Sequence, residues 1–193
     1  MQHYSKISSN IFRGSRSAAR GFTIQELLVT IAIGGTITTG AASLSNTVHD
    51  TAMTSAANEL VSHLNLARST AVARHAEVAV CPSIDQTECA SAGADHTWWH
   101  GGWLVYVDAN NNGQADSGEV VRVQNGRIAG AVTIRSSRHR RQVTYRPSGT
   151  SGGSTITLAV CDARGAASAR YVTVSNAGRA RVSRATSSEV RCS

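Results

Sequence analysis

Apolar residues in the first part of the chain follow the spacing of a long helix. Residues 22–44 carry a single charge, Glu26, and an apolar run of that length can cross a bilayer as a helix. Apolar residues then recur every three or four positions, and no proline interrupts the chain as far as Arg74. They are Leu44, Val48, Ala52, Ala56, Leu60, Leu64, Ala67 and Ala71. The pattern predicts one helix of about 50 residues, whose amphipathic second half, residues 45–76, packs on a globular domain.

Beyond the helix, the pattern changes to short runs rich in β-branched residues, which are typical of strands. Turn signals such as Asn125-Gly126 separate the runs. Eight runs predict strands, at residues 77–81, 102–107, 119–124, 131–135, 141–146, 154–161, 169–175 and 178–184. A helix followed only by strands predicts an α+β fold, in which residues 77–193 form a globular domain of antiparallel β-sheets.

Charge is distributed unevenly along the chain. Residues 1–21 carry four basic residues and no acid, whereas residues 22–121 have a net charge of −8. Residues 122–193 hold thirteen arginines against two acids, a net charge of +11. Because guanidinium groups bind phosphates and carboxylates bidentately, this half predicts a partner with such groups. The alternative is an arginine-rich surface without a ligand.

Four cysteines follow the apolar segment, and an even number in that position predicts two disulfides in an oxidising compartment. Three connectivities are open, and we prefer local pairing, of Cys81 with Cys89 and of Cys161 with Cys192. The sequence contains no Cys-x-x-Cys motif, which would indicate a zinc site. It also contains no motif of a catalytic nucleophile, a phosphate-binding loop or a metalloprotease. The sequence therefore does not predict an enzyme.

Two segments contain residues that could bind ligands. Residues 108–119 fit the spacing of a calcium loop, with oxygen ligands at Asp108, Asn110, Asn112, Asp116 and Glu119. The flanking segments are predicted strands, so an ordinary hairpin loop is the alternative interpretation. In residues 96–103, histidines could bind a metal and an exposed tryptophan could stack on bases, although Trp98 or Trp103 in the core is the more common arrangement.

Alternating arginines follow Gly178 near the end of the chain. In a strand, Arg179 and Arg181 share one face about 6.6–7 Å apart, close to the rise of about 6.8 Å over two DNA phosphates. The pair could bridge a DNA backbone without reading bases, and Gly178 would let a phosphate approach the main chain. Further arginines expected to contribute to DNA binding are Arg138, Arg140, Arg141, Arg164 and Arg184.

The stretch RGFTIQELLVTIAI, which begins at Arg20, resembles the class III signal of type IV prepilins and type II secretion pseudopilins. The resemblance implies that prepilin peptidase cuts between Gly21 and Phe22, which removes the leader 1–21, and that the new N-terminus is methylated. It also implies that Glu26 pairs with the N-terminal amine of a neighbouring subunit during assembly. A secretory signal peptide is the alternative, although an acid within its apolar run would be unusual.

Two further stretches, LNLARSTAVARHAEVAVCPS and WWHGGWLVYVDANNNGQADSGEVVRV, resemble the GspH/FimT family of minor pilins and pseudopilins. The segment 178–181 resembles the Gly-Arg-x-Arg motif of FimT-type minor pilins, which bind DNA for uptake in natural transformation. The resemblance implies an inner-membrane prepilin with a periplasmic domain, which later joins an extracellular pilus. Its expected partners are DNA and other pilins. The alternatives are a structural tip or priming subunit of FimU type and a GspH-type pseudopilin of type II secretion.

Overall fold

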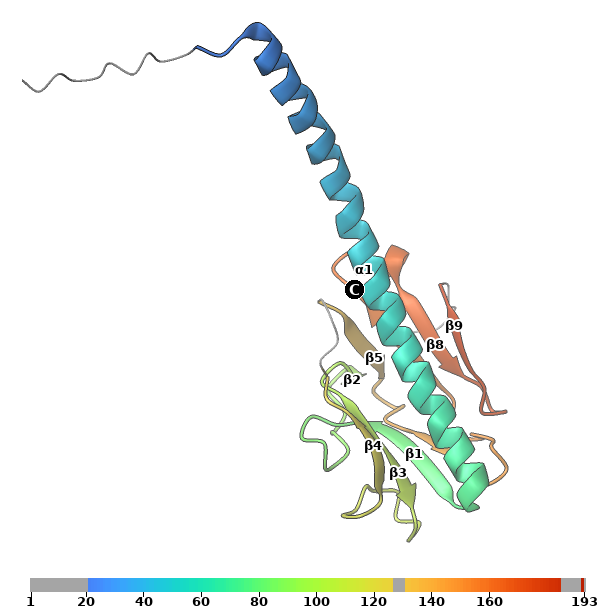
Figure 1. The fold of residues 1–193 in the computed structure, drawn as a ribbon. Coiled ribbons are helices and arrows are strands. Elements are labelled where there is room, and N and C mark those ends of the chain that lie inside the picture. The colour runs from blue at the N-terminus through green and yellow to red at the C-terminus, as the bar shows by residue number, and fades with distance from the viewer. Residues whose placement is uncertain (1–20, 127–130, 185–191, 193) are drawn as a thin grey trace, which may run out of the picture. The chain divides into compact units, whose positions relative to one another are not determined.

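A computed structural model describes residues 21–126, 131–184 and 192, and for residues 34–45 it describes the backbone alone (Figure 1). The chain divides into two compact units, Met1–Ala42 and Ser43–Ser193. Helix α1 extends over Ile24–Arg74, which confirms the single helix of about 50 residues predicted from the sequence. It ends where His75 adopts the left-handed conformation, with φ of 53°, a common way for a helix to stop.

The helix begins with a hydrogen bond between the backbone N–H of Glu26 and the side-chain oxygen of Thr23, 3.3 Å apart. In the first unit, the large apolar side chains from Phe22 to Ile33 are exposed on all sides of the helix. We expected residues 22–44 to cross a membrane. In the part of the chain that the structure describes, no helix is both long enough and apolar enough to do so.

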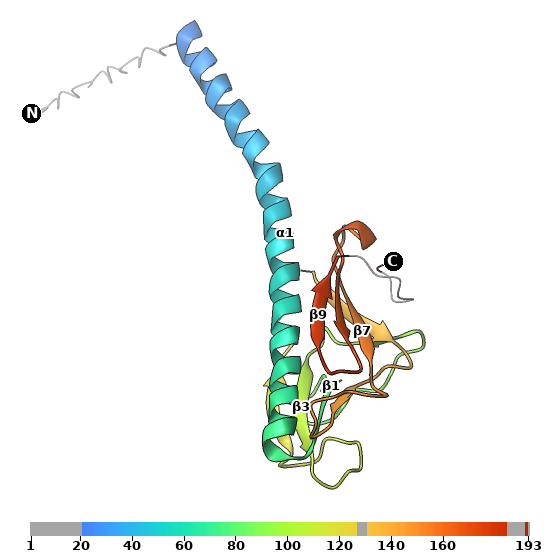
Figure 2. The same cartoon turned by 90° about the vertical axis from the view of Figure 1, so that its right-hand side faces the viewer.

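Among the described residues of the second unit, nine antiparallel strands form two sheets (Figures 1 and 2). The four-stranded sheet has the order β4-β3-β1-β6, with β1 at Glu77–Pro82, β3 at Trp103–Asp108, β4 at Val120–Gln124 and β6 at Val143–Tyr145. The five-stranded sheet has the order β2-β5-β7-β8-β9, with β2 at His96–Trp98, β5 at Thr133–Ser137, β7 at Ile156–Cys161, β8 at Arg170–Val174 and β9 at Ala180–Ser183. A short 3-10 helix, Ala166–Ser168, precedes β8.

All eight predicted strands are present, and the α+β fold with antiparallel sheets is confirmed. The sequence did not predict β2. It has only three residues and is followed closely by Gly101 and Gly102, so it lacks the run of β-branched residues that identifies a strand. The preferred disulfides are also confirmed, with Cα–Cα distances of 5.6 Å for Cys81–Cys89 and 5.7 Å for Cys161–Cys192.

The core lies between the second half of α1 and the two sheets. The predicted helical stripe is buried at Ala56, Leu60, Leu64, Ala67 and Ala71. The prediction that Val48 packs on the domain was wrong, since this residue is 66% exposed. The helix residues that contact the core begin at Ala52 and Met53.

Side chains alternate between the two faces of the five-stranded sheet, as the pleat requires. One face contacts the core through residues that include Ile134, Leu158, Val160, Val172, Val174 and Ala180. The register places their neighbours on the opposite side, which we call the outer face: Trp98 on β2, Arg135 on β5, Thr157 and Ala159 on β7, Tyr171 and Thr173 on β8, and Arg181 on β9. Strands β2 and β9 form the two edges of this sheet.

Burial of a histidine in the core predicts how stability depends on pH. The Nδ1 atom of His63 accepts a hydrogen bond of 2.8 Å from the indole N–H of Trp103. Burial lowers the pKa of His63 below its ordinary value of about 6.5, because it disfavours the charged imidazolium. The unfolded chain therefore binds the proton first as the pH falls. The contribution of neutral His63 to the free energy of unfolding is complete above about pH 6.5. It is lost as the pH decreases towards the pKa of His63 in the folded state.

We predict that His63→Gln, which keeps an acceptor for Trp103 but cannot titrate, weakens the decrease in the free energy of unfolding between about pH 7 and pH 5. Urea unfolding of the purified chain and the variant at both pH values measures this difference. An identical pH dependence in the two proteins would contradict it.

Candidate nucleic-acid interface

A tight turn joins β8 to β9 and places Arg179 at the start of the edge strand. The N–H of Gly178 donates to the carbonyl oxygen of Ser175 at 2.7 Å, and the N–H of Ser175 donates to the carbonyl oxygen of Arg179 at 3.1 Å. Gly178 has φ of 75°, a conformation that residues with a Cβ adopt only with strain. The glycine therefore defines the direction in which the arginines leave the turn.

The turn packs against the main chain of the β6–β7 loop and against α1. A Cβ atom on Gly178 would overlap the carbonyl oxygen of Gly149. The same oxygen accepts a hydrogen bond of 2.9 Å from Nε of Arg68. Gly178 is thus required for contact within the protein, which corrects our interpretation that it leaves room for a phosphate. Sequence reasoning missed the positioning role of Arg68, whose partner is 81 positions away.

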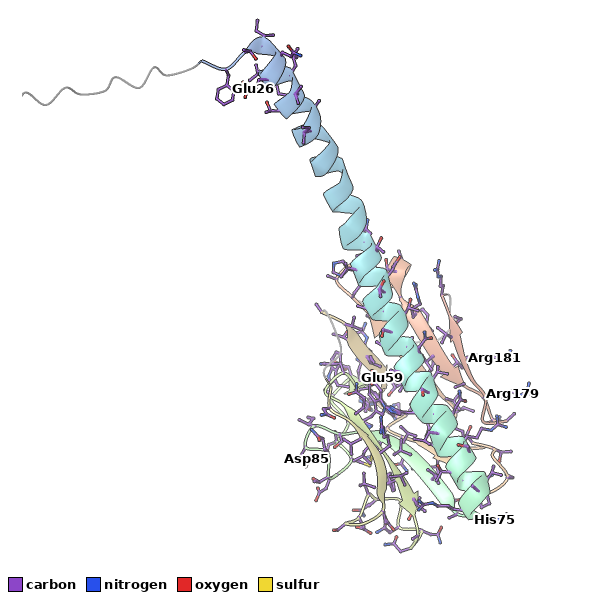
Figure 3. All side chains as sticks on the ribbon, in the orientation of Figure 1. Glu26, Glu59, His75, Asp85, Arg179 and Arg181 are labelled. Carbon is purple, nitrogen blue, oxygen red and sulfur yellow. A yellow bond between two sulfur atoms is a disulfide. The ribbon has the colours of Figure 1, made fainter. Side chains whose placement is uncertain are left out.

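Arg179 and Arg181 lie along the β9 side of the domain, and both side chains are exposed (Figure 3). Between them, Ala180 packs against the core, so the two arginines share the outer face. Neither arginine forms an ion pair or a side-chain hydrogen bond with the residues that the structure describes. Arg181 is in register with Thr173, whose hydroxyl lies 3.4 Å from that of Thr157. Arg181 therefore lies beside a pair of hydroxyl groups on the outer face, and both guanidinium and hydroxyl groups bind phosphate.

The structure separates Arg164 from Arg179 and Arg181 and pairs it with two acids within the domain. Its Nη2 atom lies 2.7 Å from a carboxylate oxygen of Asp162 and 2.8 Å from one of Asp50. The hydrogen bond with Arg164 lowers the pKa of Asp50, and hydrogen bonds with both acids raise the pKa of Arg164. These carboxylates compensate the charge of Arg164 within the domain, and its part in DNA binding stays a prediction.

Arg184, whose part in DNA binding stays a prediction, also lies apart from Arg179 and Arg181. It is an even-numbered residue at the end of β9, so it points away from the outer face. There it lines a groove of about 510 Å³ beside α1, together with Thr47, Asp50, Thr51, Thr54, Ser55, Asn58 and Arg170.

Three further predicted residues, Arg138, Arg140 and Arg141, lie in the β5–β6 loop, and the first two bind main-chain carbonyl groups of other loops. Nη1 of Arg140 donates to the carbonyl oxygen of Gly153 at 2.9 Å, and Nη1 of Arg138 donates to that of Ala94 at 3.4 Å. Arg140 and Arg141 line a cavity of about 630 Å³, which also includes the acidic side chains Glu88 and Asp116. In the described part of the chain, no hydrogen bond or ion pair connects these arginines with those of β9.

The predicted calcium loop is a hairpin connection between β3 and β4. Both carboxylate oxygens of Asp108 accept backbone N–H groups, from Asn112 at 2.9 Å and Gly113 at 2.8 Å. The side-chain amides of Asn110 and Asn112 donate to Asp116, and Glu119 accepts the N–H of Ala109. Among the described residues, no three His, Cys, Asp or Glu side chains are grouped to hold a metal ion. The oxygen groups of this loop therefore bind one another and the loop backbone, and the calcium site stays a prediction.

Comparison with known proteins gives a family model and two solved structures. The model for type II transport protein GspH matches residues 56–178, and its match therefore stops just before Arg179. Two crystal structures of the type IV minor pilin FimU of Pseudomonas aeruginosa resemble the fold, with TM-scores of 0.53 and 0.51 and identities of 24% and 23%. The alignments cover 68% and 67% of this chain and 87% and 91% of the FimU chains. No curated protein matches the chain significantly.

The close contact at Gly178 predicts an unequal response to alanine at two glycines. Gly153 also has a positive φ, of 88°, but a Cβ there would meet no atom within 4 Å. We expect Gly153→Ala to cost about 1–2 kcal/mol, from the left-handed conformation alone. Gly178→Ala should cost more, because the turn must also move away from Gly149. Urea unfolding of both variants measures the difference, and equal costs would show that the main-chain contact is unimportant.

Proposed function

Because the chain belongs to the GspH family of type II transport proteins and has the fold of a type IV minor pilin, we propose that it is a minor pilin that binds extracellular DNA. The observation that carries the proposal is the exposed pair of arginines on one edge strand, Arg179 and Arg181, with no acidic partner among the described residues. Their spacing along β9 suits two phosphates of one DNA strand.

The chemistry of this edge favours binding to the DNA backbone rather than to bases. Guanidinium groups and the hydroxyls of Thr157 and Thr173 bind phosphate oxygens, which carry no sequence information. The binding should therefore be independent of sequence and should weaken steeply as salt increases, because each neutralised phosphate releases counterions. Such binding is suited to the capture of DNA for uptake in natural transformation.

The N-terminal unit supports assembly into a pilus. Cleavage by prepilin peptidase between Gly21 and Phe22 would leave a cationic amine beside a helix whose apolar side chains are exposed, Phe22 to 79%. Exposed apolar surface of this kind must be covered by lipid before assembly and by neighbouring subunits afterwards. Pairing of Glu26 with the amine of a neighbour would compensate its charge in the filament core. The chain would thus pass from the inner membrane, with its C-terminal domain in the periplasm, to an extracellular pilus.

The arginine pair can be tested with variants that remove the same charge at different places. Arg179→Ala with Arg181→Ala should reduce affinity for duplex DNA at least about tenfold, because each charge-assisted hydrogen bond contributes about 1.5–3 kcal/mol. Arg122→Ala with Arg141→Ala is the matched control, since it removes two exposed arginines from β4 and the β5–β6 loop. Gel-shift titration of the full-length chain with two unrelated duplexes provides the measurement.

If both double variants lost the same affinity for duplex DNA, the overall positive charge of the protein, and not the arginine pair on β9, would account for binding. If the unmodified chain does not bind duplex DNA at low salt, the structural role of a tip or priming pilin becomes the better assignment. The likeness to FimU and the GspH family match favour this second candidate function. In that role, Arg179 and Arg181 would contact acidic surfaces of neighbouring pilins, or of pseudopilins in type II secretion.

A further inference from the structure

An exposed tryptophan lies at the other edge of the five-stranded sheet. Side chains alternate along β2, so that Thr97 and Trp99 are buried in the core while Trp98 lies on the outer face. Trp98 is 46% exposed, whereas Trp99 and Trp103 are completely buried. Trp98 therefore presents part of a large aromatic ring to solvent, where the ring can serve as a stacking surface.

The surrounding loops hold Trp98 in place. Gly93 lies against the indole, since a Cβ on this glycine would be 3.6 Å from Nε1 and 3.7 Å from Cδ1 of Trp98. The N–H of Gly93 donates to the carbonyl oxygen of His96 at 3.0 Å, and the guanidinium of Arg138 bonds to the carbonyl oxygen of Ala94. The loop before β2 is thus fixed from both sides, and the ring is preorganised.

Basic and aromatic groups surround the ring. Arg135 is the register partner of Trp98 on β5. It is buried, at 7% exposure, and its guanidinium carbon lies 5.9 Å from the ring centroid. The ring of His96 lies nearly parallel to the indole, with centroids 5.9 Å apart, and the ring of His100 meets it edge to face at 5.3 Å. This arrangement suits a ligand that combines a flat aromatic ring with negative charge.

We propose that Trp98, flanked by His96 and Arg135, is a stacking site for an unpaired base of single-stranded nucleic acid. Stacking on aromatic side chains beside basic groups is how proteins bind single strands without sequence preference. A base inside a duplex has both faces covered by its neighbours, so only an unpaired or terminal base can present a face to Trp98. The ligand of this site therefore differs from the duplex backbone assigned to β9.

The two sites occupy opposite edges of one outer face. Four inter-strand steps separate β2 from β9, or about 19 Å at the usual spacing. Between them, Ala159 and Tyr171 are buried in a cluster with Cys192. The stacking site thus stands on its own geometry and does not rest on the assignment of Arg179 and Arg181.

Tryptophan fluorescence tests the stacking directly, because Trp98 is the exposed tryptophan of the three. The full-length chain, purified in a mild detergent, would be titrated with oligothymidylate of about 12 residues and with an abasic oligomer of equal length. We expect oligothymidylate to quench the fluorescence more strongly than the abasic oligomer does. Trp98→Ala should remove this quenching and weaken oligothymidylate binding by about 5- to 150-fold.

Two further variants provide controls. Trp98→Phe keeps an aromatic face and should retain most of the affinity, whereas Val121→Ala changes an exposed apolar residue on β4 and should have no effect. Unchanged oligothymidylate affinity in Trp98→Ala would overturn the proposal, as would equal quenching by the abasic oligomer. The proposal would also be overturned if Trp98→Ala lost binding to other pilins but kept its affinity for nucleic acid. In that case Trp98 would be part of a contact between pilins. Duplex binding of the Arg179→Ala with Arg181→Ala variant reports separately on the proposed function.

Discussion

The carbonyl oxygen of Gly149 accepts a hydrogen bond from Arg68 of α1 and lies against Gly178, where no side chain fits. Three segments distant in sequence meet at this atom: the helix, the β6–β7 loop and the β8–β9 turn. The position of Arg179 and Arg181 depends on it, because the turn determines where β9 begins and which side chains reach the outer face. A preorganised edge strand loses little conformational entropy when it binds a ligand.

The fold divides the arginines into two groups with different roles. Arg164 and Arg170 lie beside Asp50, and Arg164 also pairs with Asp162, so their charge is compensated within the domain. Arg179 and Arg181 have no such acidic partner among the described residues, although β9 pairs directly with β8, which carries Arg170. Net charge alone could not make this distinction. It depends on which carboxylates the tertiary structure brings to each guanidinium group.

Periodicity was enough to predict α1, eight strands and the α+β plan, because those features depend on local spacing. The preferred disulfides were also correct. Each one joins two cysteines that follow one another in the sequence, Cys81 with Cys89 and Cys161 with Cys192. Tertiary contacts decided the rest. The ion pair of Arg164 with Asp50 was not foreseen because Asp50 is distant in sequence. Arg184 points away from Arg181 because of the strand pleat. The role of Arg68 was missed because its partner belongs to a distant loop. The short strand β2 had no pattern to reveal it.

Under the proposed function, duplex DNA contacts the outer face at β9 and not the cavity beside Arg140 and Arg141. A photoreactive side chain introduced at Ser183, which lies on the same face as Arg181, would test it when compared with one at His139. We predict sequence-independent cross-links to duplex DNA from position 183, with yields that fall as salt is raised from about 50 to 200 mM. Cross-links from position 139 with none from position 183 would contradict the account.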